Sequence, residues 1–302
     1  MQGKVVFITG AASGIGLATA RLMQQQGVRV VLVDCDEQLL AKAAQEFSMP
    51  VLTIVADVSK QEQCQAAVAQ TLQHFGHIDV VWANAGIASL GPLMHTDPAA
   101  WKRCFEVNVF GVFNTVRAAV PSVLAQKGYV MVTASVSTFA HPPAVSAYAA
   151  SKAAVEAMCN AWRIELDGHG VGLGVIHASW VKTPLVTEGN MHPAFLRLRK
   201  TTPGFLNQEI EVDDAARMIV AGLQRRARRI WVPGWVRMLY WLRALLHTRW
   251  AEHELLKAAP DIERLFLEGT AISGVQASSF PPRELQRKNE QGLADGVDHE
   301  RN

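Results

Sequence analysis

The chain has 302 residues, 49% of them hydrophobic, which suits one long domain or a domain with an extension. Its formal net charge of +2 does not indicate a nucleic-acid-binding protein. Four cysteines (35, 64, 104 and 159) lack the paired spacing of metal sites and disulfide frameworks, so a reducing compartment and no metal site are expected. No apolar run reaches the roughly 20 residues of a membrane span, and the first run is too short for a signal peptide. A cytoplasmic protein is the expectation.

Short apolar runs alternate with helical patterns along most of the chain. Such alternation predicts βαβ units and therefore an α/β fold with a doubly wound parallel sheet, in which ligands bind at the carboxyl ends of the strands. The expected strands are 4–9, 28–33, 51–55, 78–83, 129–133, 171–176 and 229–232. The expected helices are 15–26, 37–47, 61–75, one from about 99, 110–126, one from Tyr148 to about 166, and 211–225.

Three segments depart from this rhythm. Residues 185–208 are apolar but interrupted by Pro and Gly, and form either a lid over an apolar substrate or a surface excursion packed on the core. We expect residues 1–232 to be the catalytic domain and 233–277 a helical aromatic and basic extension. Residues 278–302 are rich in Pro, Gln and charge, which predicts a disordered tail.

A glycine-rich loop joins the first expected strand to the first expected helix. It reads Thr9-Gly10-Ala11-Ala12-Ser13-Gly14-Ile15-Gly16. Amide groups at a helix start, together with the helix dipole, attract a pyrophosphate, and glycines allow the ligand to approach the backbone. The loop therefore predicts a dinucleotide site.

Asp34 ends the second expected strand, 18 residues after Gly16. A carboxylate there can accept hydrogen bonds from both ribose hydroxyls of an adenosine and would repel a 2′-phosphate. Neither Ser13 nor Cys35 is an Arg or Lys that could hold such a phosphate. The residues favour NAD(H) over NADP(H).

Tyr148 and Lys152 are spaced i, i+4 in a stretch of strong helix formers, which places them on one helix face. An ammonium beside a phenol favours the phenolate, so we expect the pKa of Tyr148 to fall toward working pH. A tyrosine tuned in this way can exchange a proton with a substrate. A half-exposed helix with a solvated Lys would show the same spacing.

With these residues in place, residues 1–232 resemble the short-chain dehydrogenase/reductase family, which has a Rossmann fold. The matching elements are the Thr9–Gly16 loop, Asp57-Val58, Asn84-Ala85-Gly86, Asn108, Ser135 and Tyr148-x3-Lys152. The resemblance implies a homodimer or homotetramer that binds NAD and a small molecule.

The resemblance also implies roles for individual residues. Tyr148 would be the general acid in reduction and the base in oxidation, with Lys152 lowering its pKa and binding the nicotinamide ribose. Ser135 would hydrogen-bond the substrate oxygen, and Asn108 would anchor a proton-relay water. The implied cofactor contacts are Gly10, Ser13, Ile15, Gly16, Asp34, Asp57, Val58, Asn84, Gly86, Tyr148, Lys152, Val181 and Thr183.

One departure from the family pattern follows the sixth expected strand. Ala178 and Ser179 stand where the family usually has Pro-Gly, although Val181 and Thr183, expected near the nicotinamide carboxamide, are kept. Loss of the glycine puts the path of this loop in question. Trp180 faces either the substrate cleft or the core, and His141 either borders the substrate or is an ordinary loop residue.

The extension begins with residues 234–250, which read as a helix rich in Trp, Leu and Arg. Between Arg217 and Lys257 the chain carries nine Lys or Arg and two Glu. An aromatic and basic segment can lie in a membrane interface, cover the substrate cleft or pack on a partner subunit. Its apolar character suggests a bulky apolar substrate such as a steroid, a long-chain alcohol or a lipid-derived ketone.

The leading hypothesis is therefore an NAD-dependent oxidoreductase that interconverts a secondary alcohol and a ketone. The alternatives are an NADP(H)-preferring carbonyl reductase and a non-catalytic nucleotide sensor on the same fold. The joint presence of Ser135, Tyr148, Lys152 and Asn108 favours an enzyme, because a sensor needs no proton-handling set.

Overall fold

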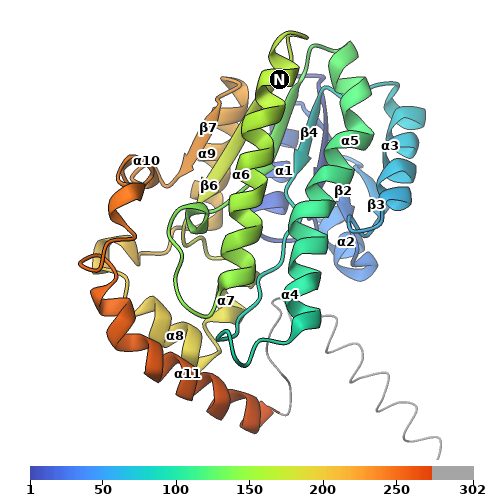
Figure 1. The fold of residues 1–302 in the computed structure, drawn as a ribbon. Coiled ribbons are helices and arrows are strands. Elements are labelled where there is room, and N and C mark those ends of the chain that lie inside the picture. Colours follow the sequence, from blue (N-terminus) through green and yellow to red (C-terminus); the bar gives the residue numbers. More distant parts are fainter. Residues whose placement is uncertain (274–302) are drawn as a thin grey trace, which may run out of the picture.

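A computed structural model describes residues 1–273 of the chain and shows one parallel sheet of seven strands (Figure 1). The strand order is β3-β2-β1-β4-β5-β6-β7, so the chain moves outward from β1 and then crosses back to place β4 beside it. This order confirms the predicted doubly wound α/β fold, and the crossing point is where such sheets bind ligands. The strands are β1 Val5–Thr9, β2 Arg29–Asp34, β3 Leu52–Val55, β4 Val80–Ala83, β5 Tyr129–Thr133, β6 Gly172–Ala178 and β7 Arg229–Val232.

Helices cover both faces of the sheet, and each face has its own hydrophobic core. Alternate residues of β1 serve the two cores, with Val5 and Phe7 in one and Val6 and Ile8 in the other, as expected for a strand buried on both sides. One core is closed by α3 Gln61–Phe75, α5 Gly111–Ala125 and α6 Ser146–Asp167. The other is closed by α1 Gly14–Gln25, α2 Glu37–Ala44 and α9 Val212–Gln224.

A long continuous helix leads into the first of these layers. It consists of α4 Pro98–Phe105, a π-helical turn Glu106–Phe110 and α5. It starts where Asp97 accepts a hydrogen bond from the Ala99 amide and Pro98 fixes the first turn. Residues 98–125 are long and apolar enough to cross a membrane, but half of the most apolar window is buried in the protein and α5 packs against the sheet. This segment is a core helix.

The segment after β6 and the C-terminal extension pack on each other. They comprise α7 Pro184–Gly189, α8 Pro193–Arg199 and the 3-10 turn Gly204–Leu206, then α10 Val236–Trp241, the 3-10 turn Arg243–Leu245 and α11 His253–Ser273. Figure 1 shows α8 and α11 side by side near the start of α6. Ala194 and Leu198 of α8 form a third apolar cluster with Ile262 and Phe266 of α11.

The extension is helical, as predicted, but residues 234–250 do not form one continuous helix. The helix ends at Trp241, and the chain turns at Leu242 before the 3-10 turn. The Arg243 guanidinium lies over the ring of Tyr240, 4.5 Å from its centroid, where Arg229 also stacks at 4.6 Å. Of these two contacts, only that of Arg229 joins distant segments, β7 and α10; Arg243 lies three residues after Tyr240 and could also reach its ring in a continued helix. The tail predicted for 278–302 lies outside the described residues.

Candidate active site

The glycine-rich loop lies so close to neighbouring backbone atoms that side chains at Gly10 and Gly16 would not fit. Gly10 has a φ of +62°, and a Cβ there would lie 2.7 Å from Ala85 Cα. A Cβ on Gly16 would lie 2.4 Å from the Gly10 carbonyl oxygen. Ser13 is the N-cap of α1, and its side chain makes no capping hydrogen bond. The first amides of α1, including that of Ile15, lack helical acceptors, so this cradle fits a pyrophosphate.

Asp34 lies at the carboxyl end of β2 beside this loop. Its carboxylate accepts hydrogen bonds from the Ala12 amide at 3.0 Å and the Asp36 amide at 3.2 Å. Burial raises the pKa of Asp34, and the backbone hydrogen bonds oppose that rise. The carboxylate is thus fixed against the loop, at the position where an adenosine ribose is expected.

Asn84 ties the neighbouring strand ends together. Its amide nitrogen donates to the carbonyls of Thr9 and Gly10, at 3.1 and 3.0 Å. Its amide oxygen accepts from the Thr133 hydroxyl at 3.0 Å. The Asn84 side chain therefore supports the glycine loop through hydrogen bonds, a role that the motif alone did not indicate.

Asp57 and Val58 both contact other residues of the protein that the sequence did not predict as their partners. The Asp57 carboxylate accepts from Ser59 and from Arg103, whose Nη2 lies 2.9 Å away. Burial raises the pKa of Asp57, but the hydrogen bonds of Ser59 and Arg103 outweigh it and the net shift is downward. Val58 is buried beneath Gly111. The implied contact of Asp57 with the cofactor remains a prediction.

Tyr148, Lys152 and Ser135 converge at the carboxyl end of β5. Lys152 is 2% exposed, its Nζ donates to the Thr133 carbonyl at 2.9 Å, and it lies 5.7 Å from the centroid of the Tyr148 ring. Ser135 is buried, and its hydroxyl oxygen accepts from the Ser137 amide at 3.1 Å. The helix start and the strand end thus place a phenol, a hydroxyl and an ammonium in one site.

The pKa shifts differ from the sequence expectation. Burial raises the pKa of Tyr148 to about 12, and a hydrogen bond with Ser135 opposes the rise. Burial also lowers the pKa of Lys152 to about 8. The expected fall in the pKa of Tyr148 is therefore not present in this structure, because desolvation of the phenol dominates. At neutral pH the phenol is protonated and can donate.

Asn108 occupies the π-helical turn, a distortion that is frequent at functional sites. Its side chain is fully buried; Oδ1 accepts from the Ile87 amide at 2.9 Å, and Nδ2 donates to the Ile87 carbonyl and to Ser151 Oγ, both at 2.9 Å. A Cβ on Gly86 would lie 3.2 Å from Lys152 Nζ and 3.3 Å from Asn108 Oδ1. The side chain thus holds the loop after β4 against the catalytic helix, and its contact with a relay water remains a prediction.

The segment after β6 returns to the glycine loop. β6 runs on through Ala178, which pairs with Val232 of β7, and the Ser179 amide donates to the Val232 carbonyl at 2.8 Å. Ala178 and Ser179 therefore continue the pairing with β7, and the Ser179 bond is one that a glycine amide would also make. Val181 is buried and pairs with Ile210. A Cβ on Gly14 would lie 3.3 Å from Thr183 Cγ2, so the predicted cofactor residues of this segment and of the loop are neighbours.

Comparisons with known proteins agree with this geometry. Residues 4–193 match the family model described as short chain dehydrogenase. The chain belongs to the short-chain dehydrogenase family. A crystal structure of a family member from Burkholderia phymatum in complex with NAD superposes with a TM-score of 0.72 at 27% identity, over 82% of this chain and 96% of that one. A 3-ketoacyl-(acyl-carrier-protein) reductase from Brucella melitensis complexed with NADH gives 0.69 at 28%, over 76% and 97%.

Curated relatives of this dehydrogenase carry several activities. The chain is 33% identical over 255 residues to 11-beta-hydroxysteroid dehydrogenase A of Sesamum indicum, covering 80% of this chain and 71% of the relative. It is 30% identical to (-)-trans-carveol dehydrogenase of Rhodococcus erythropolis, over 65% and 77%. The protein is therefore a short-chain oxidoreductase, and members of this family bind a nicotinamide dinucleotide and small-molecule substrates and commonly form oligomers.

The two predicted substrate residues lie in segments that contact the later part of the chain. Trp180 is half-buried, with Phe195 against its ring edge and the Arg199 guanidinium 4.8 Å from a ring centroid. His141 is exposed and stacks on His247 of the extension, with centroids 4.7 Å apart. Neither arrangement decides between substrate contact and packing, so both assignments remain predictions.

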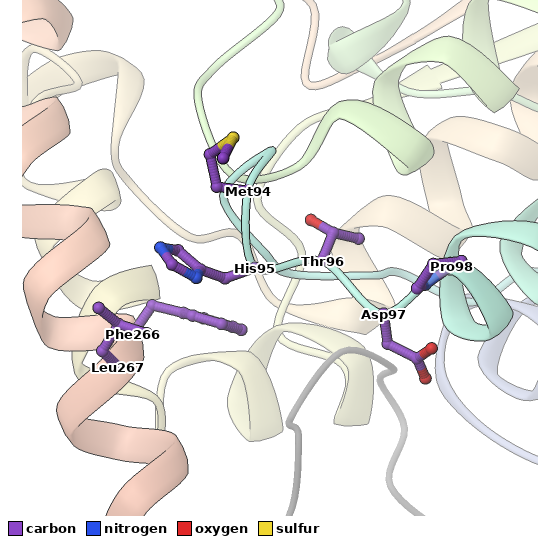
Figure 2. A pocket seen from close by; sticks show the side chains of 7 residues that line it. All are labelled: Met94, His95, Thr96, Asp97, Pro98, Phe266 and Leu267. Atoms are coloured by element: carbon purple, nitrogen blue, oxygen red, sulfur yellow. The ribbon is translucent and has the colours of Figure 1, made fainter.

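A cavity of about 440 Å³ lies between the loop before α4 and helix α11 (Figure 2). His95 Nε2 lies 2.8 Å from Glu263 Oε1 and links the two walls. None of the predicted site residues lines this cavity. Its wall residue Phe266 belongs to the cluster that contains Val145, the residue before the catalytic helix, so the cavity lies beside the site and is separated from it by apolar packing.

Two residues that shape the site, Thr133 and Ser151, were not predicted from the sequence. Thr133 accepts from Lys152 and also bonds Asn84 and Trp82. Ser151 donates to the Tyr148 carbonyl at 2.7 Å and accepts from Asn108. Ser151 lies directly before Lys152, so its place in the motif was a signal. Nothing in the local pattern distinguishes Thr133 from an ordinary strand end.

Proposed function

We propose that this dehydrogenase is an NAD(H)-dependent enzyme that interconverts a secondary alcohol and a ketone. The observation that carries the proposal is the convergence of Tyr148, Ser135 and Lys152 at the carboxyl end of β5, beside Gly86 and the glycine loop. A protonated phenol and a hydroxyl in one buried site suit the protonation of a carbonyl oxygen.

Each residue has a distinct task in this scheme. Bound nicotinamide supplies a hydride in reduction and accepts one in oxidation. The Tyr148 hydroxyl donates its proton to the carbonyl oxygen in reduction and takes it back in oxidation. The Ser135 hydroxyl hydrogen-bonds the same oxygen, and Lys152 provides a nearby positive charge that favours the phenolate during oxidation. Asn108 keeps the loop of Ile87 in position.

The preference for NAD(H) rests on Asp34. Its carboxylate is held by two backbone amides at the strand end, so it cannot easily turn away from a ribose. A 2′-phosphate placed there would meet a fixed negative charge, whereas ribose hydroxyls would donate to it. The NAD and NADH in the two similar crystal structures support the same choice.

The proposed substrate is bulky and apolar, in the class of steroids, terpenoids and long-chain ketones. Apolar side chains are exposed in the segments that follow β4 and β6, notably Leu93 at 89%, Met94 at 81% and Met191 at 79%. These segments join site residues to α4 and α8, so they suit the walls of an apolar binding surface. The hydroxysteroid and carveol dehydrogenases among the relatives support this class.

A turnover panel tests the proposal. The full-length protein is incubated with NADH and, separately, NADPH, and nicotinamide absorbance is followed with steroid, terpenoid, long-chain and small polar ketones. We expect NADH and the large apolar ketones to give the highest kcat/KM. Ser135→Ala should lower turnover by roughly 10²-fold, the size seen when a donor to a developing oxyanion is removed, while Ser137→Ala serves as the matched control. Faster turnover of small polar ketones would contradict the substrate class, and failure with every ketone of the panel would contradict the function.

A further inference from the structure

The first part of the extension presents a group of apolar side chains to solvent. Trp241 is 77% exposed, Trp250 88% and Leu245 57%, and Met238 and Leu242 are also exposed. We call these five residues, together with Arg237, Arg243 and Arg249, the Arg-Trp patch. So many exposed large apolar side chains in one short segment of the chain suit an interaction site.

Arg237 and Arg249 of the patch carry positive charge without an acid partner among the described residues 1–273, whereas Arg243 interacts electrostatically with Glu156. All three arginines are exposed, and residues 234–251 contain no Asp or Glu. Within the described residues 1–273, Arg237 and Arg249 form no ion pair. A partner that covers this surface must therefore provide negative charge as well as an apolar phase.

The same segment is anchored firmly on its inner side. Val236 is fully buried, Tyr240 packs edge-on against Phe139, and His247 stacks on His141. Because the inward positions already have partners, the exposed tryptophans do not represent a core that has failed to close. The anchoring residues Phe139 and His141 lie in the loop between Ser135 and Tyr148, so the patch adjoins the catalytic edge.

The chemistry of the patch distinguishes between partners. A second copy of the chain docked symmetrically would bring arginine against arginine, with no acid from the patch to neutralise them. A bilayer surface supplies anionic headgroups for the arginines and an acyl boundary for the tryptophans, which prefer this interface. We propose that the Arg-Trp patch docks the dehydrogenase on the surface of an anionic lipid bilayer, next to the point where an apolar substrate would enter.

Co-sedimentation with vesicles tests this proposal without using turnover, so its failure would leave the proposed function intact. The full-length protein is mixed with phosphatidylcholine vesicles with or without about a third phosphatidylglycerol. We expect binding to the anionic vesicles, and loss of most binding at about 1 M NaCl, where the screening length is only about 3 Å.

Paired variants then locate the contact. Arg237→Ala/Arg249→Ala should lower the partition coefficient by roughly tenfold or more, since each basic residue near an anionic surface strengthens binding several-fold. Trp241→Ala/Trp250→Ala should lower it similarly. The controls are Lys42→Ala and Ile164→Ala, which alter an exposed cation and a 79% exposed apolar residue elsewhere. Unchanged thermal unfolding and NADH binding show that all variants are folded.

Two results would overturn the proposal. The first is the absence of any effect that depends on the patch: either the wild type does not bind anionic vesicles, or the patch variants and the control variants co-sediment with them equally. The other is a self-associated wild type that does not bind vesicles and that the patch variants convert to a smaller species in sedimentation equilibrium. The second result would assign the patch to a subunit interface.

Discussion

The Lys152 ammonium lies 5.7 Å from the centroid of the Tyr148 ring, and both side chains project from one face of α6. Burial acts on the pair in opposite directions, raising the pKa of Tyr148 to about 12 and lowering that of Lys152 to about 8. At pH 7 the site therefore holds a neutral phenol that can donate a proton and a cation that would stabilise the phenolate formed. This state suits carbonyl reduction, whereas alcohol oxidation should be favoured as pH rises.

The buried ammonium predicts a specific pH dependence of stability. The pKa of Lys152 is about 8 in the folded protein and 10.5 when unperturbed, so between these values the unfolded chain binds more protons. The Lys152 contribution to the free energy of unfolding therefore rises with pH across this window. Lys152→Met has no titrating group at this position and lacks this pH-dependent contribution. From pH 7 to pH 10 the free energy of unfolding of the wild type should therefore rise by about 1–3 kcal/mol relative to that of the variant. Urea unfolding at several pH values measures this, and a constant difference would contradict the buried charge.

Asp34 predicts the cofactor preference. Wild type should bind NADH more tightly than NADPH. Asp34→Ala removes the fixed carboxylate, and the ratio of the two Kd values should shift toward NADPH by roughly tenfold or more, which corresponds to about 1.4 kcal/mol. As a control, Asp97→Ala removes the N-cap of α4, which accepts from the Ala99 amide, and should lower stability without changing the ratio. An unchanged ratio in Asp34→Ala would refute the assignment; titration of nucleotide fluorescence measures both Kd values.

The close packing around Gly16 predicts that a larger residue at this position disturbs the glycine loop. A Cβ there would overlap the Gly10 carbonyl oxygen and lie 2.7 Å from Asn84 Nδ2, both fixed atoms of the loop and of the side chain that supports it. Gly16→Ala should therefore weaken NADH binding by roughly tenfold or more. Gly168→Ala is the matched control, because a Cβ there meets nothing within 4 Å. Calorimetric titration with NADH compares the two, and equal affinities would show that the loop does not approach the cofactor.

Asn108 predicts a stability effect in addition to any effect on proton transfer. Asn108→Ala leaves the half-buried Ile87 amide without its acceptor and removes the donor to the Ile87 carbonyl and to the buried Ser151 hydroxyl. We expect a loss of roughly 2–4 kcal/mol in the free energy of unfolding, from unsatisfied buried groups. Asn108→Asp keeps an acceptor for the Ile87 amide and should lose less. Urea unfolding measures both, and a loss below about 1 kcal/mol in Asn108→Ala would indicate that these hydrogen bonds are dispensable.

Much of the fold could be predicted because its strands are buried on both faces. Val5 to Ile8 and Val30 to Val33 appear in the sequence as unbroken apolar runs, and glycine or Asp marks their ends. The extension could not be predicted in the same way. Residues 234–250 have helical composition, and no local pattern records the break at Leu242 or the contact between the Tyr240 ring and Arg229 of β7.

The site shows the same division. Motif spacing correctly brought Gly10, Gly16 and Asp34 to one edge, because parallel strands end together. The pKa of Tyr148 was predicted to fall because the ammonium of Lys152 lies on the same helix face. The sequence did not show that burial of the phenol would outweigh this effect and raise the pKa. Desolvation depends on the packing of β5 and α6 around the phenol, which spacing alone does not specify. Likewise Thr133 acquires its role from the strand next to it, through Asn84.

The central claim is that the Tyr148 hydroxyl transfers the proton, and the comparison of Tyr148→Phe with Tyr240→Phe tests it most directly. Tyr240 is another phenol of the fold, held by ring contacts outside the site. Steady-state turnover with NADH and the best ketone of the panel should fall by roughly 10²–10⁴-fold in Tyr148→Phe, the usual contribution of general acid catalysis. The Kd for NADH should stay within about twofold, and Tyr240→Phe should retain turnover. Near wild-type turnover in Tyr148→Phe would contradict the account.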